Sequence, residues 1–334
     1  MADAFLDRYS DSTHDVVIAR GGHPLPDAAS FESGARALRL ADENRHRGEL
    51  LVVLLSGGAS AMMAAPANGV TAAQKIATTR ALLRSGKPIA EINAVRRALS
   101  AIKGGKLALR AGRSVTFAIS DVHAPVEDDP SVIGSGPTVL PATEIGPGAG
   151  VTHVPDAQFV LIGSRRDAMA GARAAAERLG YAVHVVEPPV LGDARSAARD
   201  FAARAREITR SAGAPMCVIA SGETIVRLAE SDHGRGGRNQ EFALAAALAP
   251  GSAAGWSLLS AGTDGIDGST DAAGAIVDGT TFARARDKGL DAHRALEAHD
   301  SYPFFAALGD LVVTGPTATN VGDLFLWVTS GSSR

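Results

Sequence analysis

The chain has 334 residues and a formal net charge of -3, and 46% of its residues are hydrophobic, which is enough for about two domains with apolar cores. Its 33 basic and 36 acidic residues nearly balance and only 4% are aromatic, which argues against a nucleic-acid partner. The most apolar segment begins at Leu50 and breaks at Gly57 and Gly58, short of a bilayer span, and the first residues lack a signal-peptide pattern. We therefore expect a cytoplasmic protein with a small-molecule ligand and no membrane contact.

Runs of β-branched residues or leucine alternate along the chain with alanine-rich segments of helical length, a pattern typical of an α/β protein. The expected strands are 15–19, 50–55, 114–119, 158–162, 181–186, 216–220, 224–229, 256–260, 310–314 and 323–329. The expected helices are 30–46, 71–84, 89–101, 164–179, 193–211, 238–249 and 280–288, with shorter ones near 292 and 302. We expect mostly parallel sheets, except for the two strands joined by a tight turn from Ser221 to Thr224.

Two local features bear on domain organisation and redox state. Proline and glycine concentrate between Gly136 and Asp156, so we place a boundary near residue 155, with one domain over 1–155 and another over 156–321. The only cysteine, Cys217, lies in the apolar run MCVIA. This excludes an intramolecular disulfide and predicts a buried, unreactive thiol.

Glycines and hydroxyl groups follow the predicted strand LVVLL. In open parallel sheets, ligands bind beyond the carboxyl ends of strands, so the loop SGGASA is a candidate site. Gly57 and Gly58 allow backbone amides to approach a ligand closely, and Ser56 and Ser60 add hydroxyls near a helix start. The loop suits a phosphate or a carboxylate, but a tight turn that needs glycine for steric reasons explains it equally well.

Carboxylates follow two other predicted strands. Asp121 opens the acidic loop SDVHAPVEDD, and oxygen-rich loops suit Mg²⁺, although solvated acidic loops are common. The loop GTDGIDGSTDAAG contains Asp264, Asp267 and Asp271 between glycines. These three could hold a metal or accept a hydroxyl proton, or they could form turns that cap a nearby helix.

Arginines directly precede the helix predicted from residue 238. A helix N-terminus carries partial positive charge from its unpaired amides, so Arg235 and Arg238 are unfavourable there unless an anion binds. The motif GRGGRNQE therefore raises the question of which anion binds at this helix start.

Further candidates have equally simple structural explanations. Asn93, Arg96 and Lys103 lie in NAVRRALSAIKGGKLA and could reach an anion, but basic residues near a helix C-terminus also interact favourably with the helix dipole. Glu223 in ASGETIV could bind a hydroxyl or lie exposed in a turn.

Several common motifs are absent from the sequence. It contains no GxxxxGK[ST] phosphate loop, no GxGxxG that opens a helix, no GxSxG and no HExxH. These absences disfavour a standard nicotinamide site or hydrolase.

Taken in order, the motifs resemble those of glycerate 2-kinases of the MOFRL type over nearly the whole chain. The most specific are GRGGRNQE and TDGIDGSTDAAG, and GGHPLPD, LLSGGASAMM, INAVRRALSAIKGGKLA, SDV, GSGPTV, ASGET, DSYPFF and TGPTATNVGDL accompany them. The resemblance implies a Rossmann-like α/β/α domain and a smaller α/β domain, with the active site in the cleft between them. It also implies that the last strand, within 322–330, returns to the first domain.

The resemblance implies transfer of a phosphoryl group from ATP, with Mg²⁺, to the 2-hydroxyl of D-glycerate. Arg238 and Asp264 match the family's proposed catalytic pair. This match implies that Arg238 and the N-terminal amides of its helix together form a clamp for the transferred phosphoryl group. The implied nucleotide or phosphate ligands are Ser56, Gly57, Gly58, Ser60, Asp121, Arg235 and Asn239, and the implied substrate ligands are Asn93, Arg96, Lys103, Glu223 and Glu241. The expected metal ligands are Asp121, Asp264 and Asp267, and a monomer or homodimer is expected.

One family motif has no counterpart in this sequence. Relatives carry a GAGKA-like segment, whose lysine is assigned a catalytic role, upstream of the region where this chain begins. We expect Met1 to be either an internal methionine of a longer reading frame or the first residue of a trimmed chain. Two other functions stay open. One is an NAD(P)H-dependent hydroxypyruvate reductase, a name that relatives carry, and the other is a protein that binds nucleotide or glycerate without turnover.

Overall fold

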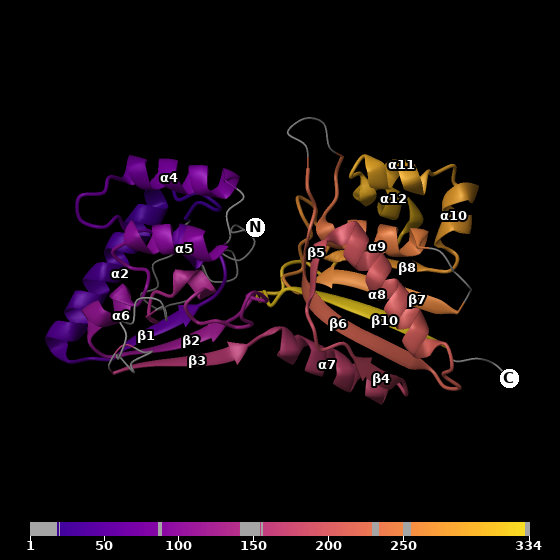
Figure 1. Cartoon of the computed structure of the whole chain (residues 1–334), viewed down its shortest axis with the longest axis horizontal. Helices are drawn as coiled ribbons and strands as arrows, with labels where there is room; N and C mark the ends of the chain where they lie inside the picture. The colour runs from indigo at the N-terminus through magenta and orange to yellow at the C-terminus, as the bar shows by residue number, and fades with distance from the viewer. Residues whose placement is uncertain are drawn as a thin grey trace. The chain divides into compact units, whose positions relative to one another are not determined.

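The computed structural model describes residues 19, 21–85, 89–140, 154, 156–228, 234–249 and 255–330. The chain divides into two compact units, Met1–Ile162 and Gly163–Arg334 (Figure 1). The strand expected at 15–19 lies outside the described residues apart from Ala19, and so does most of the segment expected to join the domains. The expected boundary near residue 155 precedes this division by one strand, because β3 (Ala157–Gly163) pairs in the first sheet.

The first unit contains a sheet with the strand order β1-β2-β3. The parallel pair β1 (Leu51–Leu55) and β2 (Ser114–Ile119) places Leu51 opposite Ser114 and Leu55 opposite Ala118. Both strands therefore end at the same edge, and the loops that follow them meet there. The described helices of this unit are α2 (Ala28–Arg47), α3 (Ala59–Met62), α4 (Ala72–Arg84), α5 (Ile89–Ala98), α6 (Lys106–Ala111) and the 3-10 turn η1 (Ile133–Ser135).

The second unit contains a mixed sheet with the strand order β4-β6-β10-β7-β8-β9, and β5 also pairs with β6. Its described strands are β4 (Ala182–Val185), β5 (Val190–Asp193), β6 (Met216–Ile225), β7 (Trp256–Gly262), β8 (Gly274–Asp278), β9 (Leu311–Val312) and β10 (Asp323–Thr329). Its described helices are α7 (Arg165–Arg178), α8 (Ala194–Thr209), α9 (Arg238–Leu248), α10 (Thr281–Asp287), α11 (Ala292–Glu297) and α12 (Ser301–Leu308).

The last strand corrects one expectation. Instead of returning to the first domain, β10 lies between β6 and β7 and is antiparallel to both (Figure 1). Its alternating side chains explain this central position: Phe325 and Trp327 join the core beneath α8 and α9, whereas Leu324 and Leu326 pack toward α7. Because β10 is antiparallel to its neighbours, the prediction of mostly parallel sheets is wrong for this unit.

The stretch ASGETIV corrects a second expectation, because it contains no turn. The whole of β6 is one strand, in which Gly222 pairs with both Val190 of β5 and Asp323 of β10. A Cβ atom at Gly222 would collide with the backbone carbonyl of Val190. Glycine is therefore needed here for the close approach of β5, and the strand passes straight through the predicted turn.

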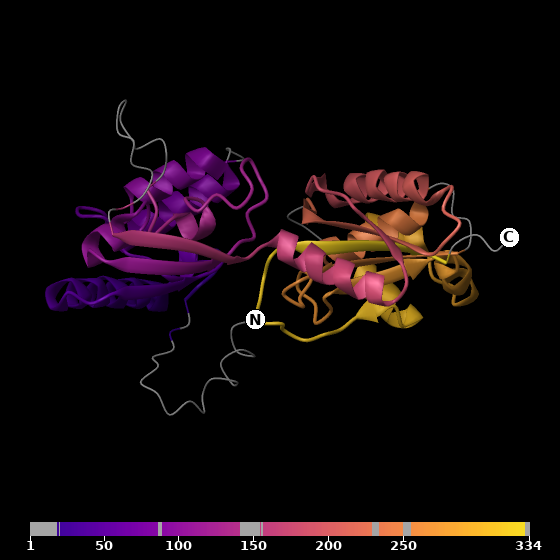
Figure 2. The same cartoon turned by 90° about the horizontal axis from the view of Figure 1, so that it is seen from below.

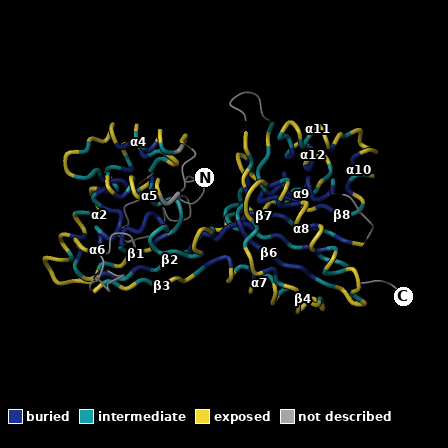
Figure 3. Tube along the Cα trace, in the orientation of Figure 1, coloured by how far each residue is buried: buried dark blue, intermediate teal, exposed yellow. Residues whose placement is uncertain are grey.

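The helix α9 is buried on all sides. It packs on the sheet beside α8, and α11 and α12 pack against it as well, whereas α7 covers the opposite face of the sheet (Figures 1 and 2). Every residue of α9 from Asn239 to Ala247 is buried, which Figure 3 shows as a dark blue segment. Small alanines let the neighbouring elements approach closely, so the position of α9 is fixed by packing.

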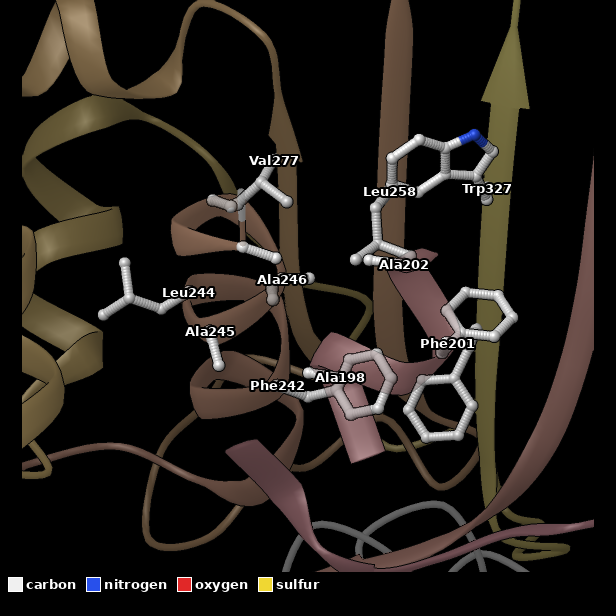
Figure 4. Close-up of a cluster of buried hydrophobic side chains, with 14 of the residues drawn as sticks. Ala198, Phe201, Ala202, Phe242, Leu244, Ala245, Ala246, Leu258, Val277 and Trp327 are labelled. Atoms are coloured by element: carbon white, nitrogen blue, oxygen red, sulfur yellow. The ribbon is translucent and has the colours of Figure 1, made fainter. Parts of the chain in front are cut away.

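Aromatic rings form the centre of this core (Figure 4). The rings of Phe242 and Phe325 stack with centroids 4.2 Å apart, and Phe201 of α8 lies 6.1 Å from each. Trp256 and Trp327 stack at 4.3 Å. Since Phe242 is on the second turn of α9, this contact also fixes the first turn of the helix.

Two further expectations concern the reactivity of Cys217 and membrane-spanning helices. Cys217 is 2% exposed, and burial raises the pKa of its thiol to about 11, which confirms the predicted unreactive cysteine. Within the ranges that the structure describes, no helix combines the length and the apolar character needed to span a bilayer.

We expect Phe242→Ala to lower the free energy of unfolding by about 3–5 kcal/mol, because it leaves a cavity among fully buried rings. The control Leu179→Ala, at a residue 75% exposed, changes it by less than about 0.5 kcal/mol. Urea denaturation of both variants measures the difference. A loss below about 1 kcal/mol for Phe242→Ala would contradict the packing described above.

Candidate functional site

The N-terminus of α9 is capped from a distance. Its N-cap residue, Gly237, has no side chain, and Asp267 in the loop after β7 takes its place. The carboxylate of Asp267 accepts hydrogen bonds from the backbone amides of Asn239 at 3.0 Å and Gln240 at 2.9 Å. A Cβ atom at Gly237 would collide with this carboxylate, so the glycine makes the cap possible.

The environment of Asp267 corrects two expectations. It is 2% exposed, and both oxygens also receive side-chain amides, from Asn239 at 3.4 Å and Gln240 at 3.0 Å. Burial raises the pKa of Asp267 to about 6, while the two backbone amides act in the opposite direction. Asp267 is therefore a helix cap and not the metal ligand expected from the sequence. Its carboxylate also occupies the helix amides that were expected to receive a phosphate.

Arg238 begins α9 and is held by a fully buried carboxylate. Its Nε donates to Asp323 Oδ2 at 2.7 Å and its Nη2 donates to Asp323 Oδ1 at 3.0 Å, a bidentate pair. Its Nη1 forms an ion pair with Glu223 Oε1 at 2.9 Å. Burial alone would lower the pKa of the Arg238 guanidinium, but Asp323 and Glu223 overcome this and raise it above its usual range. The guanidinium is thus permanently charged and its plane is fixed.

Asp323 is the residue of this cluster that the sequence analysis missed. It is 0% exposed, yet it opens the strand DLFLWVT at a position that alternates with apolar core residues. A charged residue in that register was the available signal, since a buried carboxylate requires a paired cation. Asn239 was expected to bind nucleotide, but it is buried and supports this pair: its Nδ2 donates to Asp323 at 2.9 Å, and Ser260 donates to its Oδ1 at 2.8 Å.

Two acidic side chains, Asp323 and Glu223, bind Arg238 at one edge of the sheet, and Asp264 lies near enough for its pKa to respond to the Arg238 charge. Asp323 at the start of β10 pairs with Gly222 of β6 and Gly262 of β7, so Glu223 and Asp264 lie beside it. Burial raises the pKa of Asp264, whereas the Ile266 amide, 3.0 Å from Oδ1, and the Arg238 charge lower it. The structure therefore brings the expected pair Arg238 and Asp264 together, with Glu223 partly exposed beside them.

Two other expected ligands lie apart from this cluster. Glu241 is 3% exposed and binds Arg195 Nε at 2.6 Å and His299 Nδ1 at 2.8 Å inside the unit, so the expectation that it binds substrate is not met. Arg235 lies over the ring of Tyr302, 3.7 Å from its centroid, and near Asp271 at 3.6 Å. Arg235 therefore does not join Arg238 in a clamp.

The first unit contains a cavity of about 220 Å³ where the loops after β1 and β2 meet. It brings together six of the residues predicted to bind ligands, whereas Ser56 is not part of its lining. The predicted residues that line it are Gly57, Gly58, Ser60, Asn93, Arg96 and Asp121. A Cβ atom at Gly57 would collide with the Asp121 carboxylate, so this glycine allows the two loops to touch.

Two cations of this unit have no acidic partner. Burial lowers the pKa of Arg96, and over the described residues its guanidinium has neither a hydrogen bond nor an ion pair. Lys103 is 2% exposed and donates to Ser60 O at 2.6 Å and Ser60 Oγ at 2.5 Å. Since an unpaired buried cation is costly, Arg96 gives the lining of the cavity a positive charge that a bound anion could balance.

The side chains present show how far this structure suits the expected Mg²⁺ ion. Among the side chains that the structure describes, no three histidine, cysteine, aspartate or glutamate residues are grouped closely enough to hold an ion. Mg²⁺ usually takes one or two carboxylates and completes its octahedron with phosphate oxygens and water. Asp264 fits that role, because the described residues give hydrogen bonds to its Oδ1 alone.

We expect Asp267→Asn to lower the free energy of unfolding by about 1–3 kcal/mol, because an amide group would place donors against the α9 backbone amides. Asp271→Asn is the matched control, since Asp271 lies in the same loop and is exposed. Thermal or urea denaturation compares the two. Equal stability of both variants would show that Asp267 does not cap the helix.

Two family models match parts of this chain, and named relatives match most of it. Residues 5–151 match a family described as a domain of unknown function (DUF4147), and residues 216–323 match the MOFRL family. A protein of Agrobacterium vitis named as a hydroxypyruvate reductase is 41% identical over 92% of this chain and 87% of its own length. The D-glycerate 2-kinase of Thermotoga maritima is 36% identical over 93% of this chain and 80% of its own. A crystal structure of glycerate kinase from that organism covers 95% of this chain and 82% of its own, with a TM-score of 0.83 and 35% identity. This chain belongs to the MOFRL-type glycerate 2-kinase family, in which some relatives carry the name hydroxypyruvate reductase.

Proposed function

We propose that this protein is a cytoplasmic kinase, monomeric or homodimeric, that transfers a phosphoryl group from ATP to the 2-hydroxyl of D-glycerate. The products are 2-phosphoglycerate and ADP. Its relatives named as glycerate 2-kinases support this reaction. The observation that carries the proposal is the arginine at the start of α9, whose charge and orientation are fixed by a buried carboxylate.

Arg238 would stabilise the phosphoryl group during transfer. Phosphoryl transfer spreads negative charge over three oxygens, and a cation that is already oriented stabilises this charge without reorganisation. Asp323 is fully buried and stays on the inner edge of the guanidinium. Glu223 is 42% exposed on the outer edge, where a phosphoryl oxygen could replace it.

The cavity of the first unit would bind the acceptor. Its volume of about 220 Å³ suits a three-carbon acid better than a whole nucleotide. Arg96 would pair with the carboxylate of glycerate, which supplies the missing counter-charge. Asn93 and Ser60 line the same cavity and offer partners for the two hydroxyl groups.

Asp264 is the proposed contact for Mg²⁺ in the second unit, and Asp121 is a separate candidate in the first unit. When bound, the ion would neutralise charge on the phosphate groups of ATP. Asp264 fits this role because one of its oxygens receives no hydrogen bond from the described residues. The charges of Arg238 and Asp323 also act on its carboxylate. Asp264 could instead orient or deprotonate the acceptor hydroxyl.

A direct assay separates this function from the two alternatives. We expect ADP formation that depends on both ATP and D-glycerate, followed with a coupled enzyme assay and identified as 2-phosphoglycerate by mass spectrometry. NADH oxidation with hydroxypyruvate and no ADP formation would support the reductase that some relatives are named for. Calorimetric binding of glycerate or ATP without product would indicate a protein that binds but does not turn over.

We expect Arg238→Ala to lower kcat by about 10³-fold, the usual loss for an arginine that stabilises a transferring phosphoryl group. Arg238→Lys should recover little, because an ammonium group cannot form the bidentate pair with Asp323. The matched control is Arg235→Ala, which removes a neighbouring arginine that packs on Tyr302. Steady-state kinetics test all three variants, and similar kcat values for the two alanine variants would remove Arg238 from the mechanism.

We expect Arg96→Met to raise the KM for D-glycerate by about 10- to 100-fold, which corresponds to losing a charge-assisted hydrogen bond of about 1.5–3 kcal/mol. The KM for ATP should change much less. Because the variant replaces an unpaired, largely buried cation by an apolar chain, its thermal stability should be equal or higher. An unchanged KM for D-glycerate would show that the carboxylate binds elsewhere.

A further inference from the structure

Ser60 connects the cavity of the first unit to a buried amine. Its hydroxyl lines the cavity and lies 2.5 Å from Lys103 Nζ. A second hydroxyl, Ser135 Oγ, lies 2.8 Å from Ser60 Oγ and lines the cavity as well. Any ligand hydroxyl that bonds to Ser60 is therefore one hydrogen bond away from Lys103, which is itself 2% exposed.

The surroundings of Lys103 favour its neutral amine. Burial is the main reason why its pKa lies well below the ordinary value, and repulsion from Arg96 and Lys75 adds to it. In the described part of the chain no carboxylate forms an ion pair with Lys103. The charged or titratable groups on the elements around it are Arg96 and Arg97 on α5, Lys75 on α4, Lys106 on α6, and Asp121 and His23 at the cavity.

The two other lysines of this group have a different role. Lys75 donates to the carbonyl of Leu99, and Lys106 donates to the carbonyls of Arg97 and Ser100. Both therefore bind backbone carbonyls around the end of α5, which is a stabilising position for a cation. Lys103 instead turns toward Ser60, and its role is not explained by helix capping.

We propose that, in the phosphoryl transfer proposed above, the proton of the acceptor hydroxyl passes to Ser60 while Ser60 passes its own proton to Lys103. This inference rests on the proposed function and assigns the step that it left open. Ser60 would contact the substrate directly, and Lys103 would act through Ser60.

The hydrogen bonds allow each proton to be placed. In its neutral form, Lys103 donates one N–H to the Ser60 carbonyl and accepts the Ser60 hydroxyl proton with its lone pair. The acceptor O–H then donates to Ser60 Oγ. As the new O–P bond forms and the bond to ADP breaks, the O–H bond of the acceptor breaks, and Lys103 becomes an ammonium that donates to both oxygens of Ser60.

A bound substrate would raise the proton affinity of the Lys103 amine. A carboxylate bound at Arg96 would offset the positive charge around Lys103 and so favour proton uptake while the substrate is present. After the product leaves, repulsion from Arg96 and Lys75 returns, and the proton is released. The charge that binds the acceptor would thus also control the base.

The backbone supports the placement of the second hydroxyl. Ser135 has a φ of 64°, a left-handed conformation that non-glycine residues rarely adopt, and glycines flank it at positions 134 and 136. Such conformations persist where the surrounding structure requires them. Here the conformation brings Ser135 Oγ to Ser60 Oγ, which gives Ser60 a hydrogen-bond partner in addition to Lys103.

The test compares Lys103→Met with Asp264→Asn, the rival proton acceptor, in the full chain. We expect Lys103→Met to lower kcat at least 100-fold, as the loss of a proton acceptor usually does, with a KM for D-glycerate within about threefold of the unaltered protein. In the unaltered protein kcat should rise with pH as Lys103 loses its proton, and this rise should disappear in Lys103→Met. Ser60→Ala should lower kcat with the same loss of pH dependence, whereas Ser135→Ala should retain the rise.

A purely structural role predicts other results. Because Met replaces a buried amine beside two cations, the urea midpoint of Lys103→Met should be unchanged or higher. A lower midpoint with kcat within threefold of normal would overturn the proposal, as would a pH-dependent rise that persists in Lys103→Met and vanishes in Asp264→Asn. If the unaltered chain phosphorylates no acceptor at all, the proposed function and this inference fail together, whereas full activity of Lys103→Met removes the inference alone.

Discussion

The bidentate pair between Arg238 and Asp323 is the constraint on which the second unit depends. A fully buried carboxylate is costly without a paired cation, so the central position of β10 depends on the arginine that α9 presents to Asp323. The same pair fixes the guanidinium plane and aims its outer edge at Glu223 and solvent. The Arg238–Asp323 pair therefore contributes both to the fold and to the candidate site, which explains why buried core residues lie next to the site.

The two units differ in how their buried basic side chains are balanced. In the second unit the cation is paired from within, and Asp267 occupies the helix amides that could otherwise bind an anion. In the first unit Arg96 has no acidic partner among the described residues, so its counter-charge would come from a ligand, whereas burial favours the neutral amine of Lys103. A preorganised cation suits the stabilisation of developing charge, whereas an unpaired cation suits the binding of an anionic substrate.

Glycine has a steric role at both sites. At Gly57 and Gly237 a side chain would collide with a carboxylate, and at Gly222 it would collide with a neighbouring strand. The sequence analysis considered a turn at Gly222 and the approach of a ligand at Gly57, whereas the structure places β5 against Gly222 and the Asp121 carboxylate against Gly57. Glycine by itself does not distinguish these roles, because the element that comes close is distant in sequence.

The sequence by itself determined the α/β class and the bounds of most helices and strands, and it pointed to six of the residues that line the first cavity. These follow from local periodicity and from the rule that parallel strands place their following loops at one edge. Tertiary structure alone decided the central position of β10, the continuous course of β6 and the helix-capping role of Asp267. It also decided that Asn239 and Glu241 are internal and that Asp323 holds Arg238. Each of these features depends on which segments, distant in sequence, become neighbours in the fold. Packing between such segments sets the strand order and the partners of buried carboxylates, and local sequence periodicity carries no information about it.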